Sequence, residues 1–187
     1  VHKSVKDELL GKLVDLSKSL KVGPGYEEGS ELTPVISQNQ LDKVEGYARS
    51  GIQAGAEAVH GGKRLDRKGY FMEATVLDKV TQDMTVAREE IFGPVLSVLE
   101  YEEPEEAIHI ANDTDYGLGA GVFTKDLDKA SWTASKLESG QVYVNKWFTG
   151  SLATPFGGYK QSGYSREKGQ QALNAYLQIK NVGISLS

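Results

Sequence analysis

The sequence predicts an α/β protein whose sheet is covered by helices on both faces. Stretches with apolar residues at every third or fourth position alternate with short stretches rich in β-branched and aromatic residues. Glycine and proline separate these stretches, as in GPG at 23–25. The chain has 187 residues, 39% hydrophobic and 25% charged, which is enough for one buried core. Because helices and strands alternate, we expect a parallel or mixed sheet.

The residue pattern in the first half of the chain predicts two helices and three strands. Apolar residues fall on one face of each expected helix, over 4–21 and over 38–55. A short strand over 57–62 then runs into a turn. Two further strands, over 71–77 and 95–101, are expected because both segments are rich in β-branched and aromatic residues.

The second half continues the alternation and ends in a strand-like tail. Pro104 begins a helix, since proline is well tolerated at the first helical position. After it we expect a strand over 119–124, a helix over 127–137 and a strand over 141–145. A loop from 148, a helix over 166–175 and the tail over 178–187 complete the chain. The tail has no partner strand beside it in the sequence. We therefore expect it to pair elsewhere, with another subunit.

Composition excludes several classes of function. A net charge of −5 and scattered basic residues argue against nucleic acid or an anionic membrane as a partner. The chain has no cysteine, so it holds no disulfide, zinc–thiolate site or thiol nucleophile. No apolar run reaches the ~20 residues of a membrane span. The first residues lack a signal-peptide pattern, so we expect a cytoplasmic location. The chain begins at Val1 without methionine, and we expect it to be a piece of a longer protein.

Common catalytic motifs do not occur. The glycine stretches 23–29 and 117–121 lack the spacing of a phosphate-binding loop. His2, His60 and His109 are too far apart for a spaced metal site. A G-x-S-x-G nucleophile elbow is missing as well.

Two segments stand out from this background. EEIFGPV (89–95) is either a solvated strand edge before a turn or a ligand clamp, in which a carboxylate accepts ribose hydroxyls beside a flat ring. PFGGYKQSGYSRE (155–167) can be read as a flexible loop leading into a helix. That reading explains the glycines but not Pro155-Phe156 or Arg166-Glu167.

Taken together, the motifs resemble a known family. EEIFGPV, NDTDYGLGAGVFTKDLDKA (112–130), QVYVN (141–145) and PFGGYKQSGYSRE occur in an order and spacing similar to the carboxy-terminal part of the NAD(P)-dependent aldehyde dehydrogenase superfamily. The resemblance runs over essentially the whole chain. It implies a three-layer helix-sheet-helix catalytic domain with a mostly parallel sheet, over 1–163. It also implies a C-terminal helix and oligomerisation strand over 164–187, joining a homodimer or tetramer.

The resemblance also implies a reaction. In the family a cysteine thiolate attacks a small-molecule aldehyde, and an amide side chain and a backbone N–H hold the oxyanion. Hydride passes to NAD or NADP, and a glutamate activates the water that releases the carboxylic acid. The nucleophile, the base and the main dinucleotide-binding fold precede the segment that resembles this chain. We therefore expect the isolated chain to have no dehydrogenase activity.

Cofactor-binding residues are carried over from matching positions. Glu90 corresponds to the residue that binds the nicotinamide ribose hydroxyls, and Phe92 to the ring that packs near them. Lys43 falls where the family often has a lysine reaching the same ribose, with Gln40 about one turn before it. An ordinary exposed helix lysine is the alternative for Lys43.

The resemblance assigns further roles in the second half. Glu167 corresponds to an acid described as a charge relay; a structural ion pair is the alternative. The backbone carbonyls of Lys160 and Gly163 match a potassium site of some members. The substrate tunnel is matched by the loop 146–150 and by Phe156, so its expected lining includes Trp147, Phe148, Gly150 and Phe156.

Substrate class and activity stay open at this point. Trp147 and Phe148 suit a hydrophobic aldehyde, or a cationic one through cation–π contact. Lys146 departs from the cysteine, serine or threonine that the family often has there, and it either faces solvent or favours an acidic substrate. Two alternatives to a fragment of an active enzyme remain: a natural truncated pseudoenzyme, and an oligomerising α/β module without catalysis.

Overall fold

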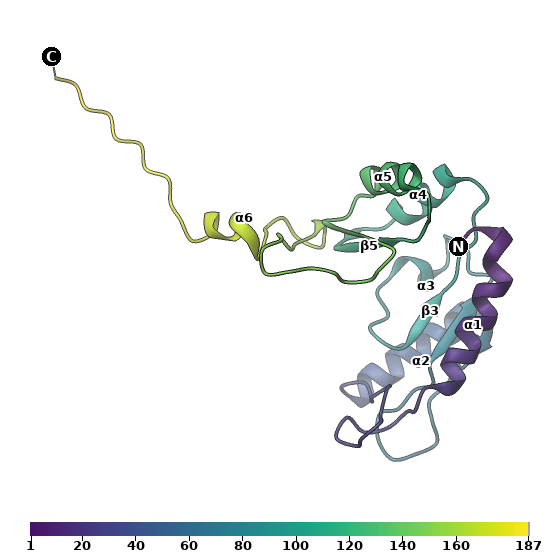
Figure 1. The fold of residues 1–187 in the computed structure, drawn as a ribbon. Coiled ribbons are helices and arrows are strands. Elements are labelled where there is room, and N and C mark those ends of the chain that lie inside the picture. Colours follow the sequence, from purple (N-terminus) through teal and green to yellow (C-terminus); the bar gives the residue numbers. More distant parts are fainter. Residues whose placement is uncertain (187) are drawn as a thin grey trace. The chain divides into compact units, whose positions relative to one another are not determined.

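The computed structural model describes residues 1–186, which fall into two compact units, 1–110 and 111–186 (Figure 1). The first unit contains a short 3-10 helix, four α-helices and three strands. In order they are η1 (Lys3–Val5), α1 (Lys6–Ser19), α2 (Gln38–Gln53), β1 (Glu57–His60), β2 (Thr75–Asp78), α3 (Thr85–Arg88), β3 (Val95–Ser97) and α4 (Pro104–Asn112), the last of which crosses the boundary. No helix in residues 1–186 is long and apolar enough to cross a membrane.

The three strands of the first unit form a mixed sheet in the order β1-β2-β3. β1 pairs antiparallel with β2, and β2 pairs parallel with β3. The segment 61–74 between β1 and β2 contains no helix. An antiparallel neighbour needs no crossover helix, so the sheet is mixed, which is one of the two arrangements that the alternation predicted.

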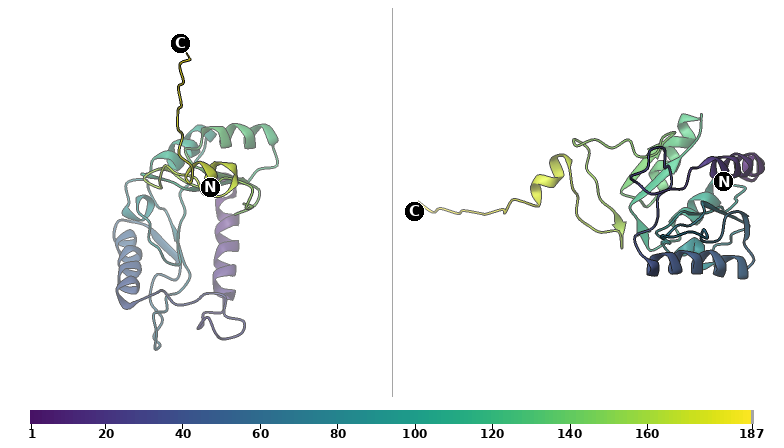
Figure 2. Two further views of the ribbon diagram at one scale, coloured as in Figure 1. Left: turned by 90° about the vertical axis from the view of Figure 1, so that its left-hand side faces the viewer. Right: turned by 90° about the horizontal axis from the view of Figure 1, so that it is seen from below.

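Helices α1 and α2 lie on opposite faces of this sheet (Figure 2). Leu77 of β2 packs with Val44 of α2 in the larger core cluster. Its neighbour Val76 points the other way and packs with Leu10 of α1. All four residues of β2 are buried, because adjacent side chains of a strand point to opposite faces and both faces are covered here.

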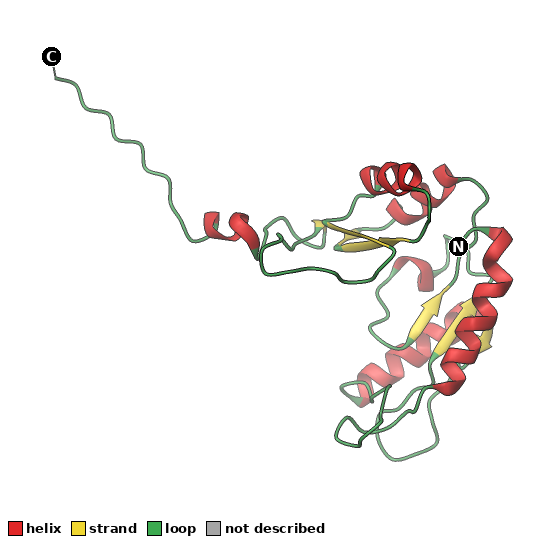
Figure 3. Cartoon of the chain, viewed as in Figure 1, coloured by secondary structure: helices red, strands yellow, loops and turns green. Residues whose placement is uncertain are grey.

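The second unit holds two small sheets and two helices (Figure 3). Its elements are β4 (Tyr116–Gly117), β5 (Gly119–Val122), α5 (Leu127–Lys136), β6 (Gln141–Val144), β7 (Tyr159–Lys160) and α6 (Gly169–Asn174). β5 and β6 are parallel, whereas β4 and β7 are antiparallel. Helix α5 connects β5 to β6 and buries Ala130, as expected for a crossover helix. Asp126 caps its first turn by accepting a hydrogen bond from the Lys129 N–H at 3.0 Å.

The tail after α6 forms no strand within the single chain. Residues 178–186 form neither helix nor strand, and the ribbon runs away from α6 as an extended segment (Figure 3). Ile179, Val182 and Ile184 are exposed. A strand is stable only when an edge supplies backbone partners, and the described part of this chain offers none to the tail. Pairing with another subunit therefore remains a prediction.

Candidate functional site

The segment Glu89–Val95 is fastened to helix α2 by one glutamine. The side-chain amide of Gln40 donates to the backbone carbonyls of Ile91 and Phe92, both at 3.1 Å. Gln40 itself lies in the first turn of α2, where its N–H donates to the side chain of Ser37 at 3.2 Å. The predicted cofactor residue Gln40 thus has a positioning role in this structure: it sets the path of the loop that carries Phe92.

Gly93 brings the loop into close contact with the helix. A Cβ atom at this position would lie 2.5 Å from one methyl group of Val44 and 2.7 Å from the other. Val44 is completely buried, so it has no room to move aside. The next residue, Pro94, accepts a hydrogen bond from the Thr75 N–H at 2.8 Å, which ties the loop to β2. The Gly-Pro turn therefore fixes the loop between α2 and the sheet.

The side chains of this loop point in opposite directions. Ile91 is buried in the larger core cluster. Phe92 adopts a left-handed backbone conformation with φ of 54°, and its ring is 75% exposed. This conformation is uncommon for a bulky residue and costs about 1–2 kcal/mol. The loop thus holds an aromatic ring out of the core at an energetic cost, as is often found at ligand-binding positions.

Glu89 and Glu90 have different surroundings. Glu89 accepts a hydrogen bond from the Tyr47 hydroxyl at 2.6 Å. Within residues 1–186 no hydrogen bond or ion pair engages the exposed carboxylate of Glu90. Lys43 is also exposed, and its ammonium lies 5.8 Å from the centre of the Tyr47 ring. Tyr47 was not singled out from the sequence, although its position four residues after Lys43 places both on one helix face.

In the second unit, four aromatic side chains form a cluster of Tyr143, Trp147, Phe148 and Phe156. The ring centres of Tyr143 lie 5.7 Å from Trp147 and 6.0 Å from Phe148, and Phe148 lies 6.3 Å from Phe156. The structure thus brings together three of the four residues expected to line the substrate tunnel, and Tyr143 of β6 contacts two of them. Gly150 lies close by, because a Cβ atom there would be 3.9 Å from the Tyr143 hydroxyl.

A backbone bridge connects this aromatic cluster to Glu167. The N–H and C=O groups of Phe156 and Glu167 exchange two hydrogen bonds, each of 2.7 Å. The side chain of Glu167 is exposed, so here the residue contributes through its backbone. Directly after it, the Lys168 ammonium lies 5.1 Å from the centre of Phe156 and 6.0 Å from that of Phe148. Sequence reasoning missed Lys168, since no local pattern reveals where a single lysine points.

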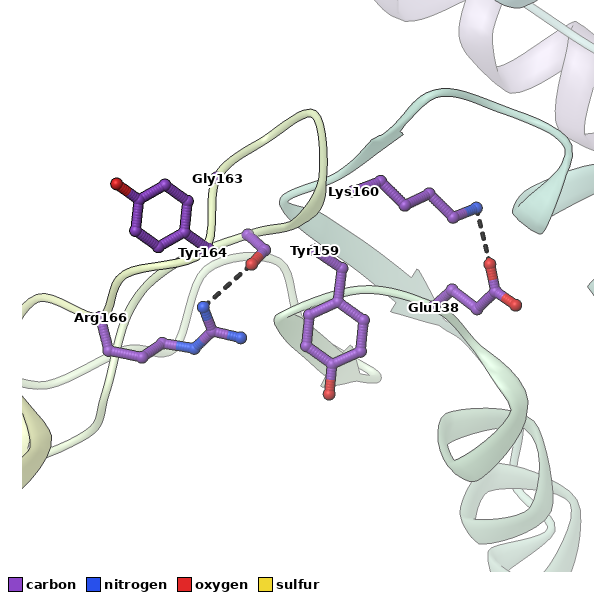
Figure 4. Close-up of a pocket in the computed structure, with 7 residues that line it drawn as sticks. Glu138, Tyr159, Lys160, Gly163, Tyr164 and Arg166 are labelled. Atoms are coloured by element: carbon purple, nitrogen blue, oxygen red, sulfur yellow. Dashed lines mark hydrogen bonds and ion pairs between the residues drawn. The ribbon is translucent and has the colours of Figure 1, made fainter.

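A pocket of about 360 Å³ lies beside β7 (Figure 4). Its charged groups have partners: the Lys160 ammonium pairs with Glu138 at 2.7 Å and donates to the Asn112 carbonyl at 2.6 Å. Arg166 donates to the Gly158 carbonyl at 2.9 Å. The pocket is lined by Glu138, Gly158, Tyr159, Lys160, Gly163, Tyr164 and Arg166.

The predicted potassium ligands Lys160 and Gly163 both line this pocket. The Lys160 carbonyl accepts the Gly163 N–H at 3.3 Å. Two carbonyls are too few oxygen ligands for a cation, and the lining holds two cationic side chains against one carboxylate. The residues present therefore do not fit a cation by themselves. In residues 1–186 no group of three or more His, Asp or Glu side chains is arranged to bind a metal.

A charge network on α2 holds the helix to the segment 61–74. Arg64 donates to Asp42 at 2.7 Å and, through Nε, to Glu45 at 2.9 Å. These hydrogen bonds lower the pKa of both carboxyls, because they favour the charged form. The network anchors the helix that carries Gln40, Lys43 and Tyr47.

Comparisons with known proteins place this geometry in context. The family model described as Aldehyde dehydrogenase family matches residues 1–182. Mitochondrial aldehyde dehydrogenase of Leishmania tarentolae is 41% identical, over 97% of this chain and 36% of that protein. Betaine aldehyde dehydrogenase of Brucella melitensis biotype 2 is 42% identical, over 100% of this chain and 39% of that protein.

Solved structures give the same result. The NAD⁺ complex of aldehyde dehydrogenase from Bacillus cereus has a TM-score of 0.96 and 41% identity, covering 100% of this chain and 38% of that one. Betaine aldehyde dehydrogenase from Staphylococcus aureus with NAD⁺ has a TM-score of 0.90 and 41% identity, covering 94% of this chain and 36% of that one. This chain therefore spans well under half the length of the proteins that it matches.

Proposed function

The chain belongs to the aldehyde dehydrogenase family, and on this premise we propose that it is the carboxy-terminal part of an enzyme that oxidises an aldehyde to a carboxylic acid with NAD or NADP. The family match confirms membership of the aldehyde dehydrogenase family, which the sequence motifs had indicated. A carboxy-terminal position is supported by the order of the motifs in the sequence. Because the chain has no cysteine, the thiolate that attacks the aldehyde has to come from residues outside it.

The observation that carries this proposal is the loop Glu89–Val95. Its carboxylate at Glu90 is exposed and unengaged within residues 1–186, and the Phe92 ring beside it is uncovered. These groups fit a nicotinamide ribose: the carboxylate accepts hydrogen bonds from two hydroxyls, and the ring supplies a flat apolar surface. When bound, the nicotinamide accepts the hydride of the oxidation.

The other residues of the cofactor site act by position. Gln40 holds the loop through the carbonyls of Ile91 and Phe92, so that Glu90 stays at the surface of α2. Lys43 is free of ion pairs within residues 1–186 and is proposed to reach the same ribose. Such fixed donors and acceptors lower the entropic cost of ordering a bound cofactor.

The aromatic cluster is proposed to form part of the aldehyde tunnel, with Gly150 beside it. Its ring–ring contacts create an apolar surface suited to a non-polar or aromatic portion of the substrate. Glu167 is proposed to contribute through its backbone bridge to Phe156, and its role as a charge relay stays a prediction. No step of the reaction is assigned to a potassium ion at Lys160 and Gly163.

Architecture and assembly follow the same proposal. Helices on both faces of the β1-β2-β3 sheet support a three-layer catalytic domain, which we assign to 1–163. Residues 164–187 are proposed as the C-terminal helix and oligomerisation strand of a homodimer or tetramer, since the apolar side chains of the tail are uncovered. Deleting 178–187 is expected to leave a monomer in sedimentation, and an unchanged oligomer would contradict this. A cytoplasmic location is kept as a proposal, although two relatives are named as mitochondrial.

A substitution at Glu90 tests the proposed cofactor site. In the full-length protein that contains this chain, Glu90→Gln is expected to raise the Kd for NAD about tenfold, because two charge-assisted hydrogen bonds weaken. The matched control is Glu89→Gln, whose carboxylate already accepts from Tyr47 and is expected to leave the Kd within about twofold. Equal effects of the two substitutions would remove Glu90 from the site.

The isolated chain tests the other half of the proposal. It is expected to show no dehydrogenase activity and to bind NAD weakly, since Glu90 engages only one ribose and the chain has no phosphate-binding loop. Calorimetry at millimolar NAD measures this directly. Micromolar affinity for NAD, or aldehyde oxidation by the isolated chain, would overturn this expectation.

A further inference from the structure

Lys168 has a backbone conformation that lysine rarely adopts. Its φ of 59° and ψ of 173° lie at the edge of a region occupied almost only by glycine, and the following Gly169 also has a positive φ of 57°. Such a conformation persists only when its surroundings enforce it. On one side, the bridge between Phe156 and Glu167 fixes the preceding residue; on the other, the Gly169 N–H donates to the Leu152 carbonyl at 2.9 Å.

The consequence of this turn is the position of the Lys168 ammonium. The group lies near two rings of the aromatic cluster, 5.1 Å from the centre of Phe156 and 6.0 Å from that of Phe148. Both distances are within the range of cation–π attraction. None of the carboxylates in residues 1–186 forms an ion pair with Lys168. The aromatic cluster therefore carries a positive charge that no carboxylate of residues 1–186 neutralises.

A second feature of the same cluster points to a ligand. Tyr143 is 7% exposed, and its hydroxyl is buried without a hydrogen-bond partner among the described residues. A buried hydroxyl is normally paired, because leaving it unpaired costs free energy. An uncompensated cation and an unpaired hydroxyl donor in one aromatic cluster are both suited to an acceptor group on a bound molecule.

We infer that Lys168 is a specificity-determining residue, which favours aldehydes that carry a carboxylate away from the reacting carbon over aldehydes that carry a quaternary ammonium. This inference rests on the proposed function, because it takes the aromatic cluster as part of the aldehyde tunnel. Aromatic faces alone would attract a cationic substrate. Here the Lys168 ammonium already faces two of the rings, so a second cation is repelled whereas an anion gains a partner.

The test compares two aldehydes of equal length in the full-length protein that contains this chain. One carries a terminal carboxylate and the other a terminal trimethylammonium group, and the measured quantity is the ratio of their kcat/KM values. The wild-type ratio is expected to favour the carboxylate. Lys168→Met is expected to lower this ratio roughly tenfold, which corresponds to about 1.4 kcal/mol, and Lys168→Glu to lower it further. Lys168→Arg keeps the charge and should keep the ratio.

Two controls separate charge from folding. Lys168→Gly removes the charge at a position whose backbone suits glycine, so it should fold at least as well as the wild type and still lower the ratio. Lys125→Met removes an exposed positive charge from the same unit outside the aromatic cluster and should leave the ratio unchanged. A ratio within about twofold of wild type in the Met, Glu and Gly variants would overturn the inference.

The two proposals fail in different ways. Suppose that the wild type oxidises both aldehydes but that the ratio of their kcat/KM values does not depend on the charge at position 168. The specificity role is then wrong and the proposed function stands. If the wild type oxidises no aldehyde with NAD or NADP, the proposed function is wrong and this inference falls with it.

Discussion

The proposed cofactor loop and the proposed substrate cluster are held in place by different means. The loop Glu89–Val95 rests on helix α2: Gln40 binds two of the loop's carbonyls, and Gly93 lies against the fully buried Val44. The aromatic cluster is built mainly on the irregular segment after β6, where ring contacts and one backbone bridge hold it. A fixed loop suits a constant cofactor, whereas a cluster on a loop adapts to different substrates.

The strongest way to break this contrast is to push the loop off the helix. Gly93→Ala places a methyl group about where Val44 already lies, and we expect a loss of about 2–3 kcal/mol in the free energy of unfolding. Urea unfolding followed by far-UV circular dichroism measures it.

Two variants check the origin of this loss. The double variant Val44→Ala/Gly93→Ala has space for the new methyl group. Its loss in the free energy of unfolding should therefore be smaller than the sum of the losses of the two single variants. Gly11→Ala, in the middle of α1 with nothing within 4 Å, should stabilise the chain by about 0.5–1 kcal/mol. If the losses at positions 44 and 93 were additive, contact between the two residues would not be the cause of the instability of Gly93→Ala.

A milder change removes the polar anchor and leaves the packing intact. Gln40→Ala deletes both hydrogen bonds to the loop, and we expect a loss of about 1–2 kcal/mol. Amide hydrogen exchange across residues 89–95 should speed up, because the loop opens more readily. Gln38→Ala, which removes only an exposed contact with Asp42, is the control. Unchanged exchange in the Gln40 variant would mean that packing alone fixes the loop.

Substitutions in the aromatic cluster should change the free energy of unfolding less than those in the loop. Phe148→Leu and Phe156→Leu keep most of the apolar volume but lose the edge-to-face ring contact, and a double-mutant cycle is expected to give a coupling of about 0.5–1 kcal/mol. Both tryptophans of the chain, Trp132 and Trp147, lie in this unit, so tryptophan fluorescence reports its unfolding. A coupling near zero would mean that the two rings are placed independently.

The smallest effect is expected from the charge network of α2, because Asp42 is exposed and Arg64 is only partly buried. Hydrogen bonds from Arg64 lower the pKa of Glu45 and Asp42 in the folded chain. Their stabilisation is therefore complete above the unfolded values of about 4 and is lost as the pH falls through the lower folded values. The difference in urea midpoint between wild type and Arg64→Met should shrink from pH 7 to pH 3. A constant difference would assign the effect of Arg64 to packing.

The helices were predictable because their signals are local. Apolar spacing placed α2 and α5 to within two residues at each end, and Pro104 marked the start of α4 correctly. Strand pairing was less predictable, since it depends on segments far apart in the chain. The antiparallel pair of β1 and β2 follows from the loop 61–74, which no periodicity distinguishes from a crossover.

The candidate sites show the same division. The sequence singled out Glu90 and Phe92, but not that Gln40 holds their loop by its backbone, because backbone acceptors are the same for every residue type. It pointed to Trp147, Phe148 and Phe156, which the fold brings together: the first two contact Tyr143, and Phe156 contacts Phe148. Lys168 could not be predicted from the sequence, since the position of its side chain depends on a backbone conformation that lysine seldom takes. Roles in binding and catalysis remain predictions for all of them.

The exposed tail has one practical consequence. Lys180 lies in the segment 178–186, which has no helix or strand to shield its backbone. Proteases cut where a chain can enter their active site in extended form, so trypsin should cleave after this lysine in a single chain. Burial of the tail in a partner's sheet would block the cut. The rate of this one cleavage therefore becomes a measure of how much of the protein is assembled at any moment.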